Sequence, residues 1–268
     1  MIEFTKMHGA GNDFVVLDAT AQTLPPLEEF SRRISDRHFG IGADQVLVVE
    51  RPSAGSGADF RMDIYNADGS RVEMCANGIR AFYEYLRSHG LTDADEVRVE
   101  TLGGVVVPRS AGPGRVRVDM GLPVLEPAKI PTTLGDGSGP VLDVALEVEG
   151  ETLTVSSASM GNPHCVIEVA DPDAYPVETI GPRVEHHAAF PNRVNVEFVQ
   201  IVSRDRIRQR TWERGTGETL ACGSGACAVA VTSMLRGVVD RRVEIELRGG
   251  TLEIVWELSL IHISEPTR

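Results

Sequence analysis

Runs of β-branched and other apolar residues recur along the chain, and each run is bounded by glycine, aspartate or proline. The clearest runs are Phe14–Asp18, Val46–Glu50, Val97–Thr101 and Val116–Met120. Segments of this length and composition predict β-strands. We therefore expect a chain that is built mainly from strands.

Two segments instead repeat their apolar or small residues at helical spacing. The first, Asn77–His89, can end at Gly90, and the second, Gly225–Arg236, can end at Gly237. The apolar positions of the first are Ile79, Phe82, Tyr83 and Leu86. Because small residues dominate the second helix, we expect it to pack tightly on all sides. Many strands around one buried helix per half predict an α+β fold of barrel-like domains.

The polar landmarks of the chain repeat. Four residues of the first half recur in order in the second half, at offsets of 150 and then 147 positions: Asn12 and Asn162, Gln45 and Asn195, Asn66 and Glu213, Cys75 and Cys222. Four matches in register are hard to obtain by chance. We predict two homologous, pseudo-symmetric halves of normal domain size, residues 1–120 and 121–257, with the Pro-rich stretch Gly121–Pro131 as the linker.

Composition excludes several functional classes. The formal net charge of -13 argues against a general partner of nucleic acids or anionic membranes. No apolar run is long enough to span a bilayer, and Met1 leads into a strand-like segment rather than a signal peptide. We expect a cytoplasmic protein.

Cofactor chemistry finds little support in the sequence. The only lysines are Lys6 and Lys129, and neither has a recognisable setting for a pyridoxal Schiff base. There is no CxxC pair or HExxH motif, so we predict no metal site. The glycine-rich loops lack the GxxxxGK[ST] pattern of a phosphate-binding loop. We expect a protein that works without a cofactor.

Cys75 and Cys222 each stand in a glycine-rich turn directly before a predicted helix. The N-terminus of a helix presents unpaired N–H groups, which lower the pKa of a thiol and can also hold a carboxylate. Inverting an α-carbon requires a base on one face and an acid on the other. Two such thiols, one on each face of a substrate, would supply both, with preorganised donors stabilising the carbanion. We predict an amino-acid epimerase or racemase.

Each candidate also has a structural interpretation. Cys165 and Cys227 are predicted to lie within a strand and a helix, so we interpret them as buried structural thiols. His164 taken alone is typical of a core histidine. Glu213 and Arg214 could form a solvated ion pair, but their position shortly before Cys222 favours a role in the site. The asparagines and Gln45 are weak candidates except through the repeat.

The chain resembles the diaminopimelate epimerase family from Lys6 to about Trp256. The motifs that carry the resemblance are MHGAGNDFVV, HFGIGADQ, NADGSRVEMCANG, SMGNPHCV, NRVNVEF and ERGTGETLACGSGACA. The resemblance implies two similar β-barrel-like domains, each around a central helix, with the active site in the cleft. It implies cofactor-independent conversion of LL-2,6-diaminopimelate to the meso form, on the route to lysine and peptidoglycan, by a protein that is typically a homodimer.

The resemblance also implies roles for individual residues. Cys75 and Cys222 would be the acid/base pair, and His164 and Glu213 would tune them. The expected substrate-binding residues are Asn12, Gln45, Asn66, Ala76, Asn77, Asn162, Asn195, Glu213, Arg214, Gly223 and Ser224.

Two departures from the family leave alternatives open. Ala76 stands where the family carries glycine, and alanine would be strained there if the backbone needs a positive φ. Residues 258–268 read LSLIHISEPTR, which we interpret as a translated sequencing adapter that replaces natural C-terminal strands and exposes a sheet edge. The alternatives are a two-cysteine racemase of another amino acid, such as proline, and an inactive relative. Proline racemases usually carry histidine where Asn77 stands.

Overall fold

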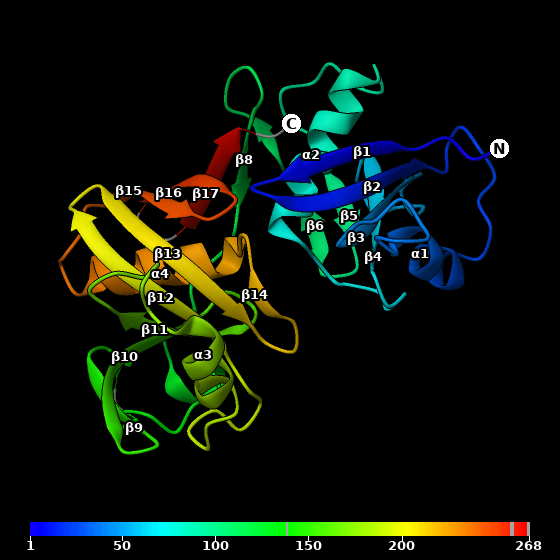
Figure 1. Cartoon of the computed structure of the whole chain (residues 1–268). Coiled ribbons are helices and arrows are strands. Elements are labelled where there is room, and N and C mark those ends of the chain that lie inside the picture. The colour runs from blue at the N-terminus through cyan, green and yellow to red at the C-terminus, as the bar shows by residue number, and fades with distance from the viewer. Residues whose placement is uncertain (138, 258–259, 267–268) are drawn as a thin grey trace. The chain divides into compact units, whose positions relative to one another are not determined.

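The computed structural model describes residues 1–137, 139–257 and 260–266 and divides into two compact units. The first unit comprises Met1–Asp119 and the described residues from Ser264 onward, and the second comprises Met120–Ile263. Figure 1 labels most helices and strands of both units.

The first unit contains a six-stranded sheet whose strands follow one another in chain order. The strands are β1 (Thr5–Gly9), β2 (Asn12–Asp18), β3 (Gln45–Glu50), β4 (Phe60–Asn66), β5 (Val99–Thr101) and β6 (Gly104–Val106). A hairpin of β7 (Arg109–Ser110) and β8 (Arg115–Asp119) follows. The helices are α1 (Leu27–Ser35) and α2 (Ala76–Ser88).

The second unit orders its strands as β17-β16-β15-β13-β12-β11-β10-β9, with β14 paired to β13. The strands are β9 (Val144–Val148), β10 (Glu151–Ser159), β11 (Pro163–Glu168), β12 (Asn195–Ser203), β13 (Arg206–Glu213), β14 (Gly217–Thr219), β15 (Arg242–Leu247), β16 (Gly250–Glu257) and β17 (Leu260–Pro266). The helices are α3 (Val177–Glu185), α4 (Gly223–Leu235) and the short η1 (Pro127–Lys129), which lies within the predicted linker.

The two units have the same order of parallel and antiparallel strand pairs. From β1 to β6 the successive pairs are antiparallel, parallel, antiparallel, parallel and antiparallel. The series β10-β11-β12-β13-β15-β16 repeats this sequence of pairings. In both units one helix connects each parallel pair, because parallel strands need a crossover. The prediction of an α+β fold with two similar halves is confirmed.

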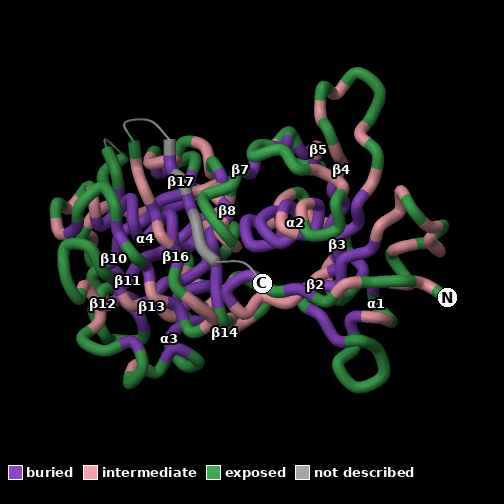
Figure 2. Tube along the Cα trace, turned by 90° about the horizontal axis from the view of Figure 1, so that it is seen from above, coloured by how far each residue is buried: buried purple, intermediate pink, exposed green. Residues whose placement is uncertain are grey.

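The second crossover helix of each unit is its central helix. α2 contacts β1, β2, β3 and β8, and α4 contacts β10, β11, β12, β15 and β16. Figure 2 shows both helices largely buried. Nearly every residue of α4 from Gly223 to Ser233 is buried, as its small side chains predicted. Among the described residues, no helix has the length and apolarity that a membrane span needs.

Several predicted boundaries were wrong. α2 begins one residue before Asn77, and α4 begins two residues before Gly225. β5 begins at Val99, so Val97 lies outside it. The helices α1 and α3 were not predicted. α3 contains Pro182 next to Gly181, and both residues disfavour a helix interior, so packing rather than propensity holds this helix.

The C-terminal segment forms a strand where the sequence predicted foreign residues. β17 lies beside β16 in the second sheet. The backbone N–H of Met120 donates to the carbonyl of Ile261 at 2.8 Å, and Ile261 and Ile263 are buried. Residues 258, 259, 267 and 268 of the predicted tail lie outside the described residues. The foreign origin of the tail stays a prediction.

A network of four charged side chains ties β2 to β3 where these parallel strands begin. Asp13 accepts hydrogen bonds from Arg37, at 2.8 and 3.1 Å, and from Lys6, at 2.6 Å. Arg37 also donates to Asp44 at 2.7 Å, and the N–H of Asp13 donates to Asp44 at 3.0 Å. Burial would raise the pKa of Asp13, but the hydrogen bonds from Arg37 and Lys6 outweigh it and lower the pKa well below its usual range.

We predict that Asp13→Asn lowers the melting temperature at pH 7, and that the difference from the unchanged protein shrinks as pH falls below 3.8. A carboxyl whose pKa falls on folding stabilises the fold above its unfolded value, 3.8, and loses that contribution as pH falls through the folded value. Melting curves between pH 7 and pH 2 measure the difference. A difference that stays constant over this range would contradict the ion-pair explanation.

We predict that Gly181→Ala destabilises the second unit by roughly 1–3 kcal/mol, because it overpacks the contact between α3 and β13. A Cβ at Gly181 would lie 2.6 Å from Cγ and 2.8 Å from Cδ2 of the Trp212 indole. Gly139→Ala is the control, because no heavy atom lies within 4 Å of a Cβ there. Urea unfolding measures both variants, and equal midpoints would show that the indole ring moves aside without cost.

Candidate active site

Cys75 and Cys222 occupy the same position in the two units, the N-cap of the central helix. Cys75 has φ -135° and ψ 117°, and its Sγ accepts a hydrogen bond from the N–H of Gly78 at 3.3 Å. Cys222 has φ -126° and ψ 112°, and its Sγ accepts from the N–H of Gly225 at 3.3 Å. In both turns sulfur takes the place that serine or aspartate oxygen usually holds at an N-cap. The prediction that each cysteine directly precedes its helix is confirmed.

In the first unit, Asn12 links the sulfur of Cys75 to the side chain of Asn77. Oδ1 of Asn12 lies 3.8 Å from Sγ of Cys75 and 3.4 Å from Nδ2 of Asn77. The other end of the Asn12 amide donates to Asp44 at 2.9 Å. Because the carboxylate can only accept, it turns the carbonyl end of this amide toward the cysteine.

A second pair of predicted residues meets across β3 and β4. Gln45 and Asn66 are opposite one another in the antiparallel register, and Nε2 of Gln45 donates to Oδ1 of Asn66 at 3.0 Å. Nδ2 of Asn66 donates to Ser70 at 3.0 Å. Oε1 of Gln45 is buried without a partner among the described residues. The first unit therefore brings together Asn12, Asn77 and Cys75, and separately Gln45 and Asn66.

Ala76 is the first residue of α2, and it is not among the residues with positive φ. The strain considered for alanine at this position is therefore absent, because a helical N1 position suits any L-residue. Gly223 and Ser224 hold the corresponding first two positions of α4.

In the second unit, Glu213 and Arg214 lie at the end of β13, next to other predicted residues. Oε1 of Glu213 accepts from Thr219 at 2.6 Å. The backbone N–H of Arg214 donates to Oδ1 of Asn195 at 2.9 Å, and Nδ2 of Asn195 donates to the carbonyl of Pro163 at 2.9 Å. Asn195 thus fixes the loop that carries Arg214 against β11.

His164 and Glu197 form a pair that is fully buried. Nδ1 of His164 lies 2.8 Å from Oε1 of Glu197, and both side chains have 0% exposure. Nε2 of His164 lies 2.9 Å from Oδ1 of Asn162. The imidazole therefore connects a buried carboxylate to one of the predicted substrate-binding amides.

The expectation of a lowered thiol pKa at the helix N-terminus is wrong for Cys222. Burial raises the pKa of this thiol well above its usual value, and the carboxylates of Glu213 and Glu197 raise it further. The hydrogen bonds from Ser224 and from the N–H of Gly225 lower it, but they do not compensate. These surroundings favour the thiol form of Cys222.

The remaining cysteines lie where the sequence placed them. Cys165 is buried in β11, and Cys227 is buried in α4. Burial raises the pKa of the Cys165 thiol well above its usual value. These environments fit the structural role that we predicted for both thiols.

Sequence reasoning missed two polar residues of these half-sites, Glu197 and Asp44. Glu197 follows Asn195 by two positions, so both side chains lie on the same face of β12. That spacing was a usable signal. Asp44 directly precedes Gln45, but only the pairing of β2 with β3 brings its carboxylate to Asn12.

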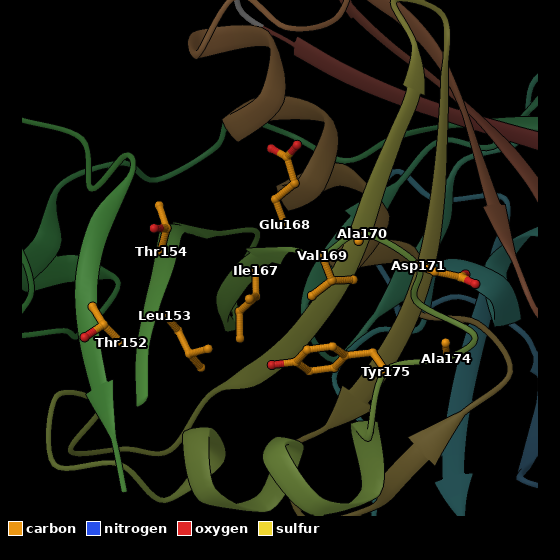
Figure 3. A pocket seen from close by; sticks show the side chains of 10 residues that line it. All are labelled: Thr152, Leu153, Thr154, Ile167, Glu168, Val169, Ala170, Asp171, Ala174 and Tyr175. Atoms are coloured by element: carbon orange, nitrogen blue, oxygen red, sulfur yellow. The ribbon is translucent and has the colours of Figure 1, made fainter. Parts of the chain in front are cut away.

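The described residues contain no cluster of histidine, cysteine and acidic side chains that could hold a metal ion. A separate pocket of about 520 Å³ lies in the second unit, between β10 and the end of β11 with the segment that follows it. Figure 3 shows the side chains that line this pocket. Its lining residues include Leu153, Glu168 and Tyr175 but none of the predicted site residues. This pocket therefore belongs to a different part of the unit than Cys222.

Known proteins resemble the chain in sequence and in fold. The sequence profile of the family described as diaminopimelate epimerase matches residues 4–126 and 156–259. A diaminopimelate epimerase of Burkholderia vietnamiensis is 51% identical over 261 residues, which are 96% of this chain and 90% of that protein. Diaminopimelate epimerase 1 of a Nostoc species is 51% identical over 258 residues, which are 95% of this chain and 92% of that protein.

Solved structures share the fold at low sequence identity. A probable proline racemase from Agrobacterium radiobacter has a TM-score of 0.73 at 16% identity and covers 100% of this chain and 91% of its own. A protein of the PhzF family from Bacillus anthracis has a TM-score of 0.68 at 17% identity and covers 99% of this chain and 96% of its own. The motifs around both cysteines and the profile match together show that the chain belongs to the diaminopimelate epimerase family.

Proposed function

We propose that this protein converts LL-2,6-diaminopimelate to meso-diaminopimelate with Cys75 and Cys222 as its acid/base pair and without a cofactor. The observation that carries the proposal is the equivalence of the two thiols. Each is the N-cap of a central helix and accepts an N–H hydrogen bond at 3.3 Å. A reaction that inverts one carbon needs two such groups, one for each face.

The chemistry begins with a thiolate that removes the α-proton from one face while a thiol delivers a proton to the other. The first sulfur takes the proton from Cα, and the electron pair of that C–H bond stays on Cα. The second cysteine gives its S–H proton to the opposite face of Cα, where this electron pair forms the new C–H bond. After this step the first cysteine is a thiol and the second is a thiolate, which is the arrangement that the reverse reaction requires. The open N–H groups at the starts of α2 and α4 are suited to hold the substrate carboxylate as negative charge develops.

The polar side chains around each cysteine fit a substrate that carries a second amino-acid group. Amide groups and one guanidinium can bind a distant carboxylate and ammonium through hydrogen bonds. The proposed substrate-binding residues are Asn12, Gln45, Asn66, Ala76, Asn77, Asn162, Asn195, Glu213, Arg214, Gly223 and Ser224, with His164 and Glu213 tuning the thiols. This composition favours diaminopimelate over proline, which is the runner-up substrate class.

The same reasoning extends to the setting of the protein. We propose a cytoplasmic enzyme of lysine and peptidoglycan precursor synthesis that works as a homodimer. The shared identity with named diaminopimelate epimerases supports this extension. Gel filtration with light scattering tests the dimer directly.

We predict that Cys75→Ala and Cys222→Ala each reduce epimerisation on the order of 10³-fold or more while the fold is retained, because each removes one member of an acid/base pair. Cys165→Ala is the control, since it makes the same change at a buried thiol outside the site. Circular dichroism checks the fold. Full stereochemical turnover by either single variant would rule out the two-base mechanism.

We predict that solvent deuterium enters Cα of LL-diaminopimelate during turnover, because the returned proton comes from a thiol that exchanges with water. Proton NMR in D2O follows the loss of the Cα signal, and a parallel sample with L-proline tests the runner-up. Deuterium exchange with proline but not with diaminopimelate would contradict the proposed substrate. The protein would then be a racemase of another amino acid.

A further inference from the structure

The two repeat halves differ directly beneath their cysteine-capped helices. The offset of 150 that relates Gln45 to Asn195 also relates Phe14 to His164 and Leu47 to Glu197. The register agrees, because β2 pairs Phe14 with Gln45 and β11 pairs His164 with Asn195. The first half therefore has two apolar side chains where the second has an imidazole and a carboxylate.

Contacts with the helix confirm that Leu47 and Glu197 occupy equivalent places. A Cβ on Gly78, in the first turn of α2, would lie 3.2 Å from Cδ2 of Leu47. A Cβ on Gly225, in the first turn of α4, would lie 2.5 Å from Oε1 of Glu197. The carboxylate thus lies against the helical turn whose N–H groups face Cys222.

Burying this pair is costly, and the fold does not require it. Both side chains are fully buried, and Oε2 of Glu197 has no partner among the described residues. Removing a carboxylate from water costs more than one hydrogen bond returns. Because Phe14 and Leu47 fill the same places in the first half, the charged pair needs a reason other than the architecture.

We propose that Glu197 is a positioning residue of the epimerase reaction: its carboxylate fixes His164 against Asn162 and disfavours negative charge on the sulfur of Cys222. The inference deepens the proposed function and rests on it. Glu197 acts through His164 and Cys222 and need not touch the substrate.

The charged and titratable groups around Cys222 agree with this role. Glu197 of β12 and Glu213 of β13 both disfavour a thiolate, while Ser224 and the N–H of Gly225, on α4, favour it. His164 of β11 lies against Glu197. In the first half the corresponding positions of the two carboxylates are Leu47 and Asn66, which carry no charge. The surroundings of the Cys222 thiol therefore carry negative charge at positions where the first half carries none.

Glu197→Gln tests the inference with little change in shape, because the amide oxygen of glutamine can still accept from His164. The rate at which iodoacetamide alkylates Cys222 is measured from pH 6 to pH 11 by mass spectrometry, with fragmentation to separate Cys222 from Cys227. We expect the midpoint for Cys222 to fall by about one pH unit or more, because one nearby negative charge is lost.

Glu185→Gln is the matched control. Glu185 is also a buried carboxylate of the second unit, but it accepts from Trp212 and Gly215 and is not among the main causes of the pKa shift of Cys222. We expect the Cys222 midpoint to stay unchanged in this variant. The high-pH limb of the epimerisation rate should move to lower pH in Glu197→Gln and stay in place in Glu185→Gln.

Glu197→Leu provides the second variant, since it copies the residue at the equivalent position of the first half and removes the charge without leaving a polar group. An unchanged Cys222 midpoint in either folded variant would overturn the inference. Absence of deuterium exchange in the unchanged protein would instead overturn the proposed function, while the alkylation profile would still decide the role of Glu197.

Discussion

The hydrogen bond from a backbone N–H to a cysteine sulfur at the start of a central helix is the interaction on which the site depends. It fixes the side chain of Cys75 through Gly78 and that of Cys222 through Gly225, both at 3.3 Å. Because the bond uses the N–H of the third helical residue, each thiol is held beside the remaining unpaired donors of the same turn. One short contact therefore places a proton-transfer group next to a site for a carboxylate.

The sheets explain how such a turn can be built twice. In each unit the central helix connects two parallel strands, and the preceding strand ends just before the loop that carries the cysteine. The strand connectivity is the same in both units, but the side chains near the central helices differ. Leu47 lies against the first turn of one helix and Glu197 against that of the other, and the neighbouring strands carry the buried Phe14 and His164. The fold thus supplies equal geometry, and a few strand residues place charge beside one thiol where the other half carries apolar or neutral side chains.

Local patterns predicted what depends on neighbouring residues in the chain. The helices after Cys75 and Cys222 were recognisable from apolar spacing and terminal glycines, and the halves from repeated polar landmarks. α3 was not recognisable, because Gly181 and Pro182 oppose a helix that its tertiary packing explains, including the close approach of Gly181 to Trp212. The raised pKa of Cys222 was also beyond local reasoning, because it comes first from burial in the folded unit and then from carboxylates on β12 and β13. Ala76 looked strained only while its helical conformation was unknown.

The parallel crossovers also have a consequence for how the chain folds. The strands that flank α2 join Phe60 to Val99, and those that flank α4 join Arg206 to Glu244, so each contact closes a loop of about 40 residues. Closing such loops costs chain entropy before packing repays it, so both half-sites are completed late. Until then the thiols of all four cysteines are open to solvent. A reducing environment during folding therefore protects the reactive groups before the structure itself can bury them.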